Sequence, residues 1–275
     1  MCVRAVAMVL IAGAWLSAQQ PLGPAQDRAH YSLEKEAALG KQLAADFRRR
    51  SIPIDSSILQ IYLDRLGHKI GAQMPDVGLP FTFTAIAGEP CGIREPAALP
   101  GGYIFVPAGL LIAAREEGEV AGMLAHAMAH VAQHPVIPPG TRGTPATIPL
   151  IFRGSGGDCP GGPPVPQAFL AMQRSAERQA DVLAAQTMAR AGFDPKSLVR
   201  YLERVQSSNA DSSILDRDER IADLLADIQK LPDVSYAAAP ADEFATARRE
   251  ALRLTEAPVR FPAPPSLMRK KHEAR

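Results

Sequence analysis

The sequence lacks an excess of charge of one sign, and after its N-terminus it lacks a long hydrophobic run. Its 275 residues carry 30 basic and 29 acidic side chains, so the formal net charge is +1. Nucleic-acid-binding proteins concentrate positive charge on a patch or stripe, and nothing in this balance points to such a partner. The length is sufficient for one well-buried domain or two small ones.

No apolar run after the N-terminus reaches the roughly 20 residues that a membrane-spanning helix needs. The best candidate, residues 103–114, is interrupted by Pro107. The N-terminus itself is different: residues 1–4 are short and basic, residues 5–16 are apolar, and Ser17-Ala18 precede polar residues. This pattern predicts a signal peptide over residues 1–18, with an uncleaved anchor as the alternative. We therefore expect a periplasmic or secreted protein without a transmembrane span in its mature chain.

Cysteine is scarce, with only three in the chain. Cys2 would leave with the signal peptide, so Cys91 and Cys159 would remain in an oxidising compartment where a disulfide could persist. The sequence alone leaves open whether these two residues pair.

The order of periodic segments predicts an α+β domain over residues 27–254 that is mainly helical with a small β-sheet. Alternating or β-prone residues at 81–86 and 103–106 indicate two strands. Apolar residues at helical spacing predict helices over residues 32–50, 55–73, 168–191, 195–207, 216–230 and 241–254, with a further helical run around 119–134.

Two other segments have a composition that opposes regular structure. Residues 135–166 are about half proline and glycine, which cannot propagate a helix. A loop of this length inside a domain is either mobile decoration or a lid over a site. Residues 255–275 are rich in proline and end in basic residues, and we expect a disordered tail.

The chemistry centres on the run EVAGMLAHAMAHVAQH from Glu119 to His134. His126 and His130 are four residues apart, so they share one face of a helix and can offer two nitrogens to a Zn²⁺ ion. In the protease motif H-E-x-x-H a glutamate follows the first histidine as general base, but here that position is Ala127. Without that glutamate the pair is weak support for a metal site, because two incidental surface histidines give the same spacing.

A second predicted helix carries Glu177 and Asp181, which are also four residues apart and share a face. A zinc ion held by two histidines needs at least one more protein ligand, and Glu177 could supply it while Asp181 orients a histidine. The same spacing also occurs on ordinary solvated helices.

Further segments make the pattern more specific. They are Ser32 to Gly40 (SLEKEAALG), Leu99 to Val106 (LPGGYIFV), Gly109 to Leu111, Glu119 to His126 with His130, Glu177 with Asp181, and Ala191 to Pro195. Together, and in this order, they resemble the gluzincin zinc metallopeptidase family of HtpX, BepA and the CAAX prenyl proteases, and most nearly its soluble periplasmic members. The resemblance covers residues 32–195. It implies a zincin-like fold, zinc bound by His126, His130 and Glu177, and Asp181 as the partner of a ligand.

The chain also departs from that family. Ala127 replaces the general base, Glu95-Pro96 replaces an asparagine-alanine pair, and a histidine-proline motif is absent ahead of Arg220-Ile221. Other proton routes are poor: Glu119 lies about 10 Å along the helix from His126, and His134 reaches at most the edge of the site.

We therefore expect a zinc-binding pseudoprotease that holds an extended polypeptide, in a groove beside the strand Tyr103, Ile104, Phe105 and Val106, which could add a chain at a free edge. The alternatives are an active zinc metalloendopeptidase that uses another proton route, and a scaffold that has also lost its zinc.

Overall fold

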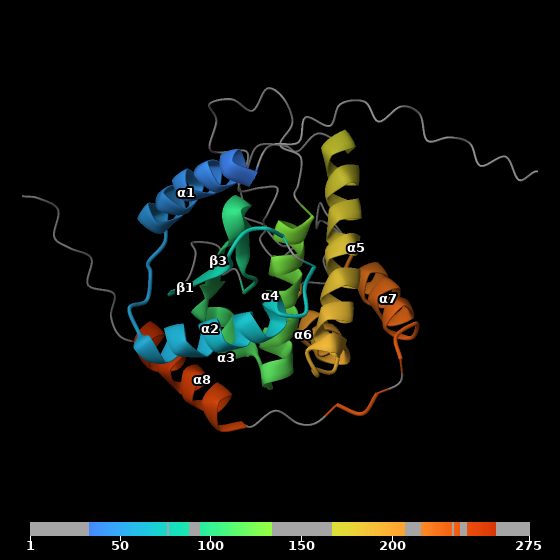
Figure 1. The fold of residues 1–275 in the computed structure, drawn as a ribbon. Coiled ribbons are helices and arrows are strands. Elements are labelled where there is room, and N and C mark those ends of the chain that lie inside the picture. Colours follow the sequence, from blue (N-terminus) through green and yellow to red (C-terminus); the bar gives the residue numbers. More distant parts are fainter. Residues whose placement is uncertain are drawn as a thin grey trace, which may run out of the picture. The chain divides into compact units, whose positions relative to one another are not determined.

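The computed structural model describes residues 33–75, 77–87, 94–133, 167–206, 216–232, 234–236 and 241–256, and every structural statement below concerns these residues. The elements, in chain order, are α1 (Leu33–Arg50), α2 (Ser57–Gly71), β1 (Thr82–Ile86), β2 (Ala97–Leu99), the 3₁₀ helix η1 (Pro100–Gly102), β3 (Tyr103–Pro107), α3 (Ala108–Ala113), α4 (Glu117–Ala132), α5 (Gln167–Arg190), α6 (Lys196–Val205), α7 (Arg217–Ile228) and α8 (Ala241–Glu256). Figure 1 shows their arrangement.

The three described strands form one sheet in the order β1-β3-β2. β1 runs parallel to β3, with Thr82 opposite Tyr103, and β2 runs antiparallel to β3, with Leu99 opposite the same Tyr103. The expectation that residues 103–106 offer a free edge is therefore wrong, because β3 has a neighbour on each side. The sequence did not predict β2, whose three residues are too few to show an alternating pattern.

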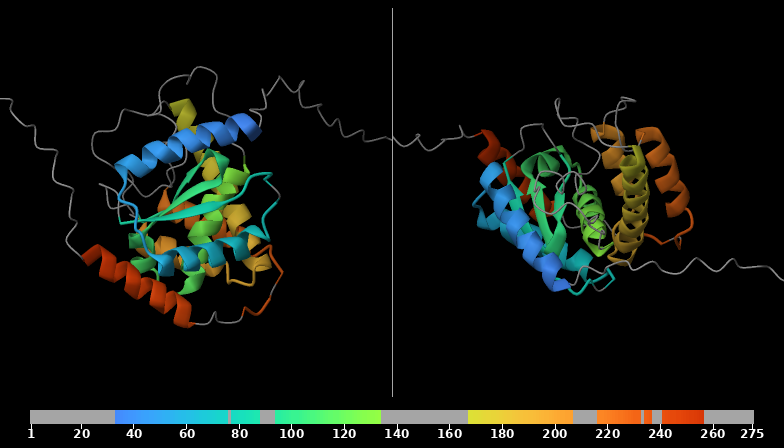
Figure 2. Two further views of the ribbon diagram at one scale, coloured as in Figure 1. Left: turned by 60° about the vertical axis from the view of Figure 1, so that its left-hand side comes forward. Right: turned by 90° about the horizontal axis from the view of Figure 1, so that it is seen from above.

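The two faces of the sheet contact different helices because successive side chains of a strand point to opposite faces. Ile104 and Val106 of β3 join the main hydrophobic core, which also contains residues of α2 and α4. Phe105 points the other way into a smaller cluster with Leu43 and Ala44 of α1. α1 and α4 consequently lie on opposite sides of the sheet, as Figure 2 shows.

α4 lies between the sheet on one side and α5 and α6 on the other (Figure 2). All of its residues from Glu119 to Val131 are buried. A helix that is apolar around its whole circumference belongs in a core rather than at a surface. Gly122 allows the close approach of α6, because a Cβ atom at this position would lie 2.9 Å from Leu198 Cβ. The helix that carries His126 and His130 is therefore fixed from all sides.

The turn between β2 and β3 depends on glycine. Gly102 has φ +82, a conformation that side chains other than glycine adopt with strain, and a Cβ atom there would lie 2.1 Å from Pro80 O. The chain can therefore reverse direction here only with a glycine, and this reversal places β2 beside β3.

The α+β prediction, mainly helical with a small sheet, is confirmed: eight α-helices and three strands are described, and each predicted helix from 32–50 to 241–254 corresponds to an observed one. In the described part of the chain, no helix combines the length and the apolar character needed to span a bilayer. The predicted signal peptide (1–18), Cys91, Cys159, the Pro/Gly-rich loop (135–166) and nearly all of the tail (255–275) lie outside the described residues.

Candidate metal centre

His126 and His130 occupy one face of α4, one turn apart, and both are buried. Their Nε2 atoms lie 3.1 Å from each other. The two rings meet edge to face with centroids 4.6 Å apart. The helical spacing thus brings two imidazole nitrogens to a common point.

α5 packs directly against α4 and brings two carboxylates to the histidines. Glu177 Oε2 lies 3.3 Å from His126 Nε2, and Glu177 Oε1 lies 3.3 Å from His130 Nε2. One turn further along α5, Asp181 Oδ1 lies 2.8 Å from His126 Nδ1. Glu177 therefore faces both histidines on the side where their Nε2 atoms converge, whereas Asp181 contacts His126 from behind.

Arg220 of α7 completes the group from the far side of Asp181. Its Nε and Nη2 atoms donate to the two oxygens of Asp181, each over 2.7 Å. Arg220 is only 1% exposed. The sequence analysis named Arg220 only as part of a pair and missed this contact. A signal was present, because Arg220 lies four and eight residues before Leu224 and Ile228, which form the buried face of α7.

The charges of this cluster balance one another. Burial raises the pKa of Asp181, but the Arg220 guanidinium outweighs burial and holds the pKa below its usual range. Burial likewise raises the pKa of Glu177, but His130 and His126 lower it well below the usual value. Burial lowers the pKa of His126, and Asp181 more than offsets this and raises it to about 9. Both carboxylates are therefore ionised at neutral pH.

This arrangement could hold a metal ion. One ligand atom from each of His126, His130 and Glu177 lies within 4.8 Å of the others. Glu177 Oε2 is buried and has no hydrogen-bond partner among the described residues, although His126 Nε2 lies 3.3 Å and Arg220 Nη2 4.0 Å from it. A buried carboxylate oxygen is stabilised by positive charge, which a bound cation would supply in addition to Arg220. Asp181 Oδ1 can accept a hydrogen bond from His126 Nδ1–H, and in the neutral ring with that tautomer the Nε2 lone pair is free to bind a cation.

Ala127 lies between the two histidines in the chain and is 1% exposed. Its methyl group cannot accept a proton, so position 127 contributes nothing to acid–base chemistry. Glu119 does not substitute for it, because its carboxylate accepts a hydrogen bond from Arg115 N over 2.8 Å and pairs with Arg204. His134 lies outside the described residues.

A further buried carboxyl group interacts electrostatically with the cluster. Glu95, two residues before β2, is 3% exposed, and its Oε2 has no hydrogen-bond partner among the described residues. Burial raises its pKa, although Arg220 and His126 act in the opposite direction. The sequence analysis noted Glu95 only as a departure from the family pattern. No periodic signal could have placed it, because it precedes a three-residue strand.

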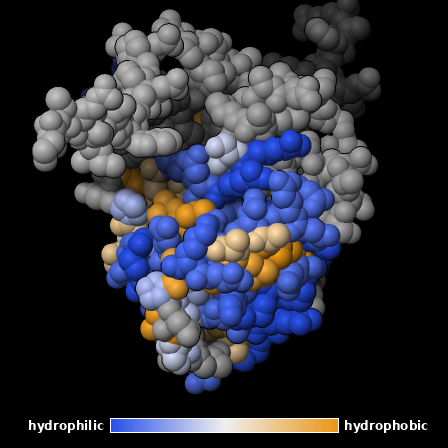
Figure 3. Space-filling model, turned by 90° about the vertical axis from the view of Figure 1, so that its right-hand side faces the viewer, coloured by the Kyte–Doolittle hydropathy of each residue, from blue (hydrophilic) through white to orange (hydrophobic). Residues whose placement is uncertain are grey.

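The face formed by α5 and α7 is mostly hydrophilic with a hydrophobic band across it (Figure 3). On this face Arg178 of α5 pairs with Glu219 and, through Nε, with Asp223 Oδ2 at 3.1 Å, both on α7. These ion pairs hold the two helices together on the outside of the Asp181–Arg220 contact.

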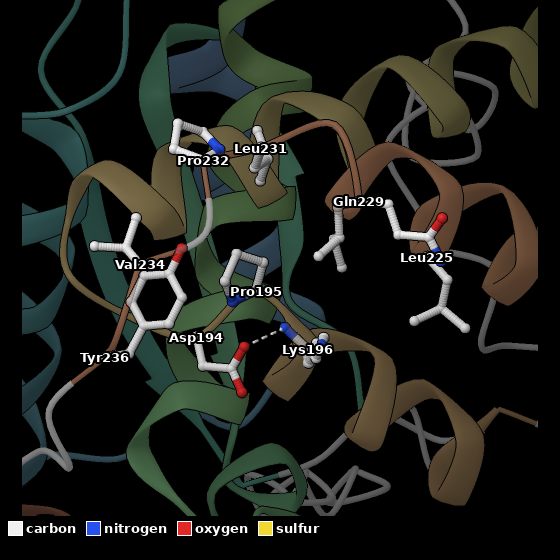
Figure 4. A pocket seen from close by; sticks show the side chains of 10 residues that line it. Asp194, Pro195, Lys196, Leu225, Gln229, Leu231, Pro232, Val234 and Tyr236 are labelled. Carbon is white, nitrogen blue, oxygen red and sulfur yellow. Dashed lines mark hydrogen bonds between the residues drawn. The ribbon is translucent and has the colours of Figure 1, made fainter.

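A further cavity lies elsewhere. Its volume is about 610 Å³, and it lies between the start of α6, the end of α7 and the segment after α7 (Figure 4). Asp194 Oδ1 accepts a hydrogen bond from Lys196 N, and Tyr236 and Val234 also line the cavity, as Figure 4 shows. No residue of the metal cluster lines this cavity, so it is separate from the chemistry described above.

No family model matches the chain. Several curated proteins are similar to it in sequence. The chain is 29% identical to a beta-barrel assembly-enhancing protease of Vibrio cholerae over 63% of this chain and 38% of the relative. It is 26% identical to the protein of the same name in Yersinia pestis, over 68% of this chain and 42% of the relative. For the protein of that name in Escherichia coli the identity is 23%, over 63% and 38%.

The chain thus spans about two fifths of the length of these curated relatives. Their name is that of a protease, and the group of His126, His130 and Glu177 is one that could hold the metal of a metalloprotease. The resemblance to gluzincin metallopeptidases inferred from the sequence is confirmed: over about two thirds of its residues this chain is similar to beta-barrel assembly-enhancing proteases.

Proposed function

We propose that this chain is an exported, zincin-like protein that binds zinc through His126, His130 and Glu177 and holds an extended polypeptide. We further propose that it hydrolyses peptide bonds far more slowly than a protein with glutamate at position 127. The observation that carries the proposal is the convergence of two histidines and a carboxylate beside Ala127.

The distances within the cluster suit zinc. Zinc binds histidine and carboxylate ligands at about 2.0–2.1 Å with tetrahedral geometry, which separates two ligand atoms by roughly 3.3 Å. The separations that involve His126 Nε2, His130 Nε2 and the Glu177 oxygens are 3.1, 3.3 and 3.3 Å. The two 3.3 Å separations involve different oxygens of Glu177, and one atom from each side chain lies within 4.8 Å of the others, so one ion could be held by all three side chains. With three protein ligands a fourth position would stay open, as in catalytic zinc sites.

The sheet offers a place for a polypeptide. β2 is the outer strand beside β3 and also contacts α4, the helix of the two histidines. An extended chain can add to a sheet edge through backbone hydrogen bonds alone. This assigns to β2 the role that the sequence analysis gave to residues 103–106. A polypeptide ligand also agrees with the name of the relatives, which are proteases.

The absence of an acid–base residue at position 127 limits catalysis. When bound, zinc polarises a peptide carbonyl and lowers the pKa of a water molecule towards about 7. Transfer of a proton by a positioned side chain contributes roughly 10²–10⁴ in rate. Ala127 cannot make this transfer, so we expect binding of polypeptide to exceed its cleavage.

Casein digestion by wild type and Ala127→Glu tests this function. We expect zinc-loaded Ala127→Glu to degrade casein at least about 100-fold faster than wild type. Addition of His126→Ala to Ala127→Glu should abolish that gain, which attributes the activity to this site. Rapid, chelator-sensitive digestion by wild type would refute the proposal.

The second candidate function is a zinc metalloendopeptidase that uses another proton route. The observation in its favour is Glu95, a buried carboxyl group that interacts electrostatically with His126 and Glu177. The casein experiment separates the two candidates, because rapid, chelator-sensitive digestion by wild type is expected only for the metalloendopeptidase.

A further inference from the structure

We propose that Arg220 is a positioning residue for the metal ligand His126. Its planar guanidinium fixes the orientation of Asp181, and Asp181 in turn orients the His126 ring for a cation at Nε2. The inference rests on the proposed function, because it requires zinc at His126, His130 and Glu177. It assigns the role to the shape of the guanidinium and not to its charge.

Arg220 holds Asp181 through both carboxylate oxygens. Nε donates to Oδ2 and Nη2 donates to Oδ1, each over 2.7 Å. Two parallel hydrogen bonds from a planar fork fix the plane of a carboxylate as well as its position, whereas a single ionic contact lets the carboxylate rotate. Arg220 is 1% exposed and Asp181 3%, so little water can compete for these bonds.

The fixed carboxylate places one oxygen at His126. Asp181 Oδ1 lies 2.8 Å from His126 Nδ1 and 2.7 Å from Arg220 Nη2, and these two nitrogens are themselves 3.4 Å apart. With a proton on Nδ1 both nitrogens are donors, so the same oxygen accepts from both. Rotation of the carboxylate would therefore disturb both contacts together. The orientation of the His126 ring thus depends on the contact between Arg220 and Asp181.

The packing of α7 holds Arg220 in this place. Asp216, the N-cap of α7, accepts hydrogen bonds of 3.0 Å from two backbone N–H groups of the first turn. Leu224, one turn after Arg220 on the same face, is 1% exposed and belongs to the main core. On the outer side Arg178 of α5 pairs with Asp223 at 3.1 Å. α7 therefore lies fixed along α5, as Figure 1 shows, with Arg220 directed inward.

The positive charge of Arg220 alone would oppose a bound metal ion. Arg220 Nη2 lies 4.0 Å from Glu177 Oε2, an oxygen of a proposed ligand. Like charges repel more strongly where water is excluded, so a guanidinium at this place weakens the attraction of the site for Zn²⁺. A buried arginine is also costly to desolvate. Orientation of Asp181 explains why the site contains this arginine, whereas attraction of zinc does not.

Arg220→Lys separates shape from charge, because lysine keeps the positive charge but presents it as a point charge without the planar fork. Competition with a chromophoric chelator measures the zinc affinity of wild type, Arg220→Lys, Asp181→Asn and the double variant. In the wild-type background we expect Arg220→Lys to weaken zinc binding at least about 10-fold. In the Asp181→Asn background the same substitution should change the affinity less than about 3-fold, because the carboxylate through which Arg220 acts is gone.

Arg178→Lys is the matched control, since it makes the same change in an exposed ion pair between α5 and α7. Its zinc affinity should stay within about 2-fold of the wild-type value. Circular dichroism and thermal unfolding identify the temperature range in which every variant is folded, and affinities are compared only within that range.

NMR of the zinc-loaded protein gives a second readout that does not depend on affinity. In wild type the Nη protons of Arg220 should give separate resonances, because the two hydrogen bonds to Asp181 restrict rotation of the guanidinium. The Nδ1–H of His126 should exchange with water at least about 10-fold faster in Arg220→Lys than in wild type, because a charge-assisted hydrogen bond to Asp181 has been lost. Arg178→Lys should exchange this proton at the wild-type rate.

The outcomes are distinct. Equal weakening of zinc binding in both backgrounds would show that Arg220 acts without Asp181 and would overturn the inference. Wild-type affinity in Arg220→Lys would show that charge is sufficient and would also overturn it. So would averaged Nη resonances of Arg220 in wild type or an unchanged exchange rate of His126 Nδ1–H in Arg220→Lys. A wild type that binds no zinc would instead refute the proposed function itself.

Discussion

Asp181 Oδ1 lies 2.8 Å from His126 Nδ1, and the same carboxylate is held by two hydrogen bonds from Arg220. One side chain therefore links α4, α5 and α7 behind the candidate metal centre. By accepting a hydrogen bond from Nδ1–H it favours the tautomer in which His126 Nε2 can bind a cation. The predictions below follow from this contact and from the residues around it.

Asp181→Asn should weaken zinc binding about 10- to 100-fold, because an amide does not hold the His126 tautomer as a carboxylate does. Competition with a chromophoric chelator measures the change. Asp223→Asn is the matched control, since Asp223 is on the surface of α7 and pairs with Arg178. Equal affinities for wild type and Asp181→Asn would show that this contact does not support the metal.

Arg220→Met should lower the free energy of unfolding by about 3–5 kcal/mol, because it leaves the buried charge of Asp181 without its partner. Urea unfolding of metal-free protein measures this loss. Arg178→Met removes an exposed guanidinium from α5, and its cost should stay below about 1 kcal/mol. Similar costs for the two variants would contradict the assignment of Arg220 as the balancing charge.

The stability of the metal-free protein should fall as the pH rises from about 6.5 to 9. The pKa of His126 is raised to about 9, against about 6.5 in an unfolded chain. Its contribution is therefore complete below about pH 6.5 and is lost as the pH passes through 9. Chemical unfolding at several pH values with a chelator present should show this decrease. His126→Ala should be less sensitive to pH over the same range.

Zinc should reverse that trend. The ion replaces the proton of His126, so zinc affinity should rise over the same pH range. A metal-free protein whose stability is constant from pH 6.5 to 9 would contradict the coupling between His126 and Asp181.

Gly102→Ala should destabilise the protein by about 3 kcal/mol or more, because a Cβ atom would lie 2.1 Å from Pro80 O at φ +82. Gly192→Ala is a matched control: φ is +80, but no heavy atom lies within 4 Å of its Cβ position. Only the backbone strain of about 1–2 kcal/mol should remain there. Thermal unfolding compares the two, and equal midpoints would refute the role of the tight turn beside β2.

Sequence periodicity was sufficient to place the helices and to put Glu177 and Asp181 on one face, because spacing of four is a local property of a helix. It could not show which faces meet. Arg220 meets Asp181 only through the packing of α7 against α5. Glu95 lies two residues before β2, a strand too short to be predicted, so its electrostatic interaction with His126 could not be expected from the sequence.

The wrong expectation that residues 103–106 form a free edge of the sheet has a similar cause. Residues 103–106 are β-prone along their whole length, but β-propensity does not predict how many strands pair with this one. The number of neighbouring strands depends on the turn at Pro100–Gly102, which places β2 beside β3. The relation of the long Pro/Gly-rich segment (135–166) to the site lies outside the described residues.

The most direct test of this account is the metal content of the purified protein, measured by mass spectrometry for wild type, His126→Ala, Glu177→Ala and the surface variant Glu116→Gln. The account predicts one zinc ion per chain in wild type and Glu116→Gln, and almost none in the other two at an unchanged fold. A wild type that is folded but binds no zinc, or a Glu177→Ala variant that retains the full amount, would contradict it.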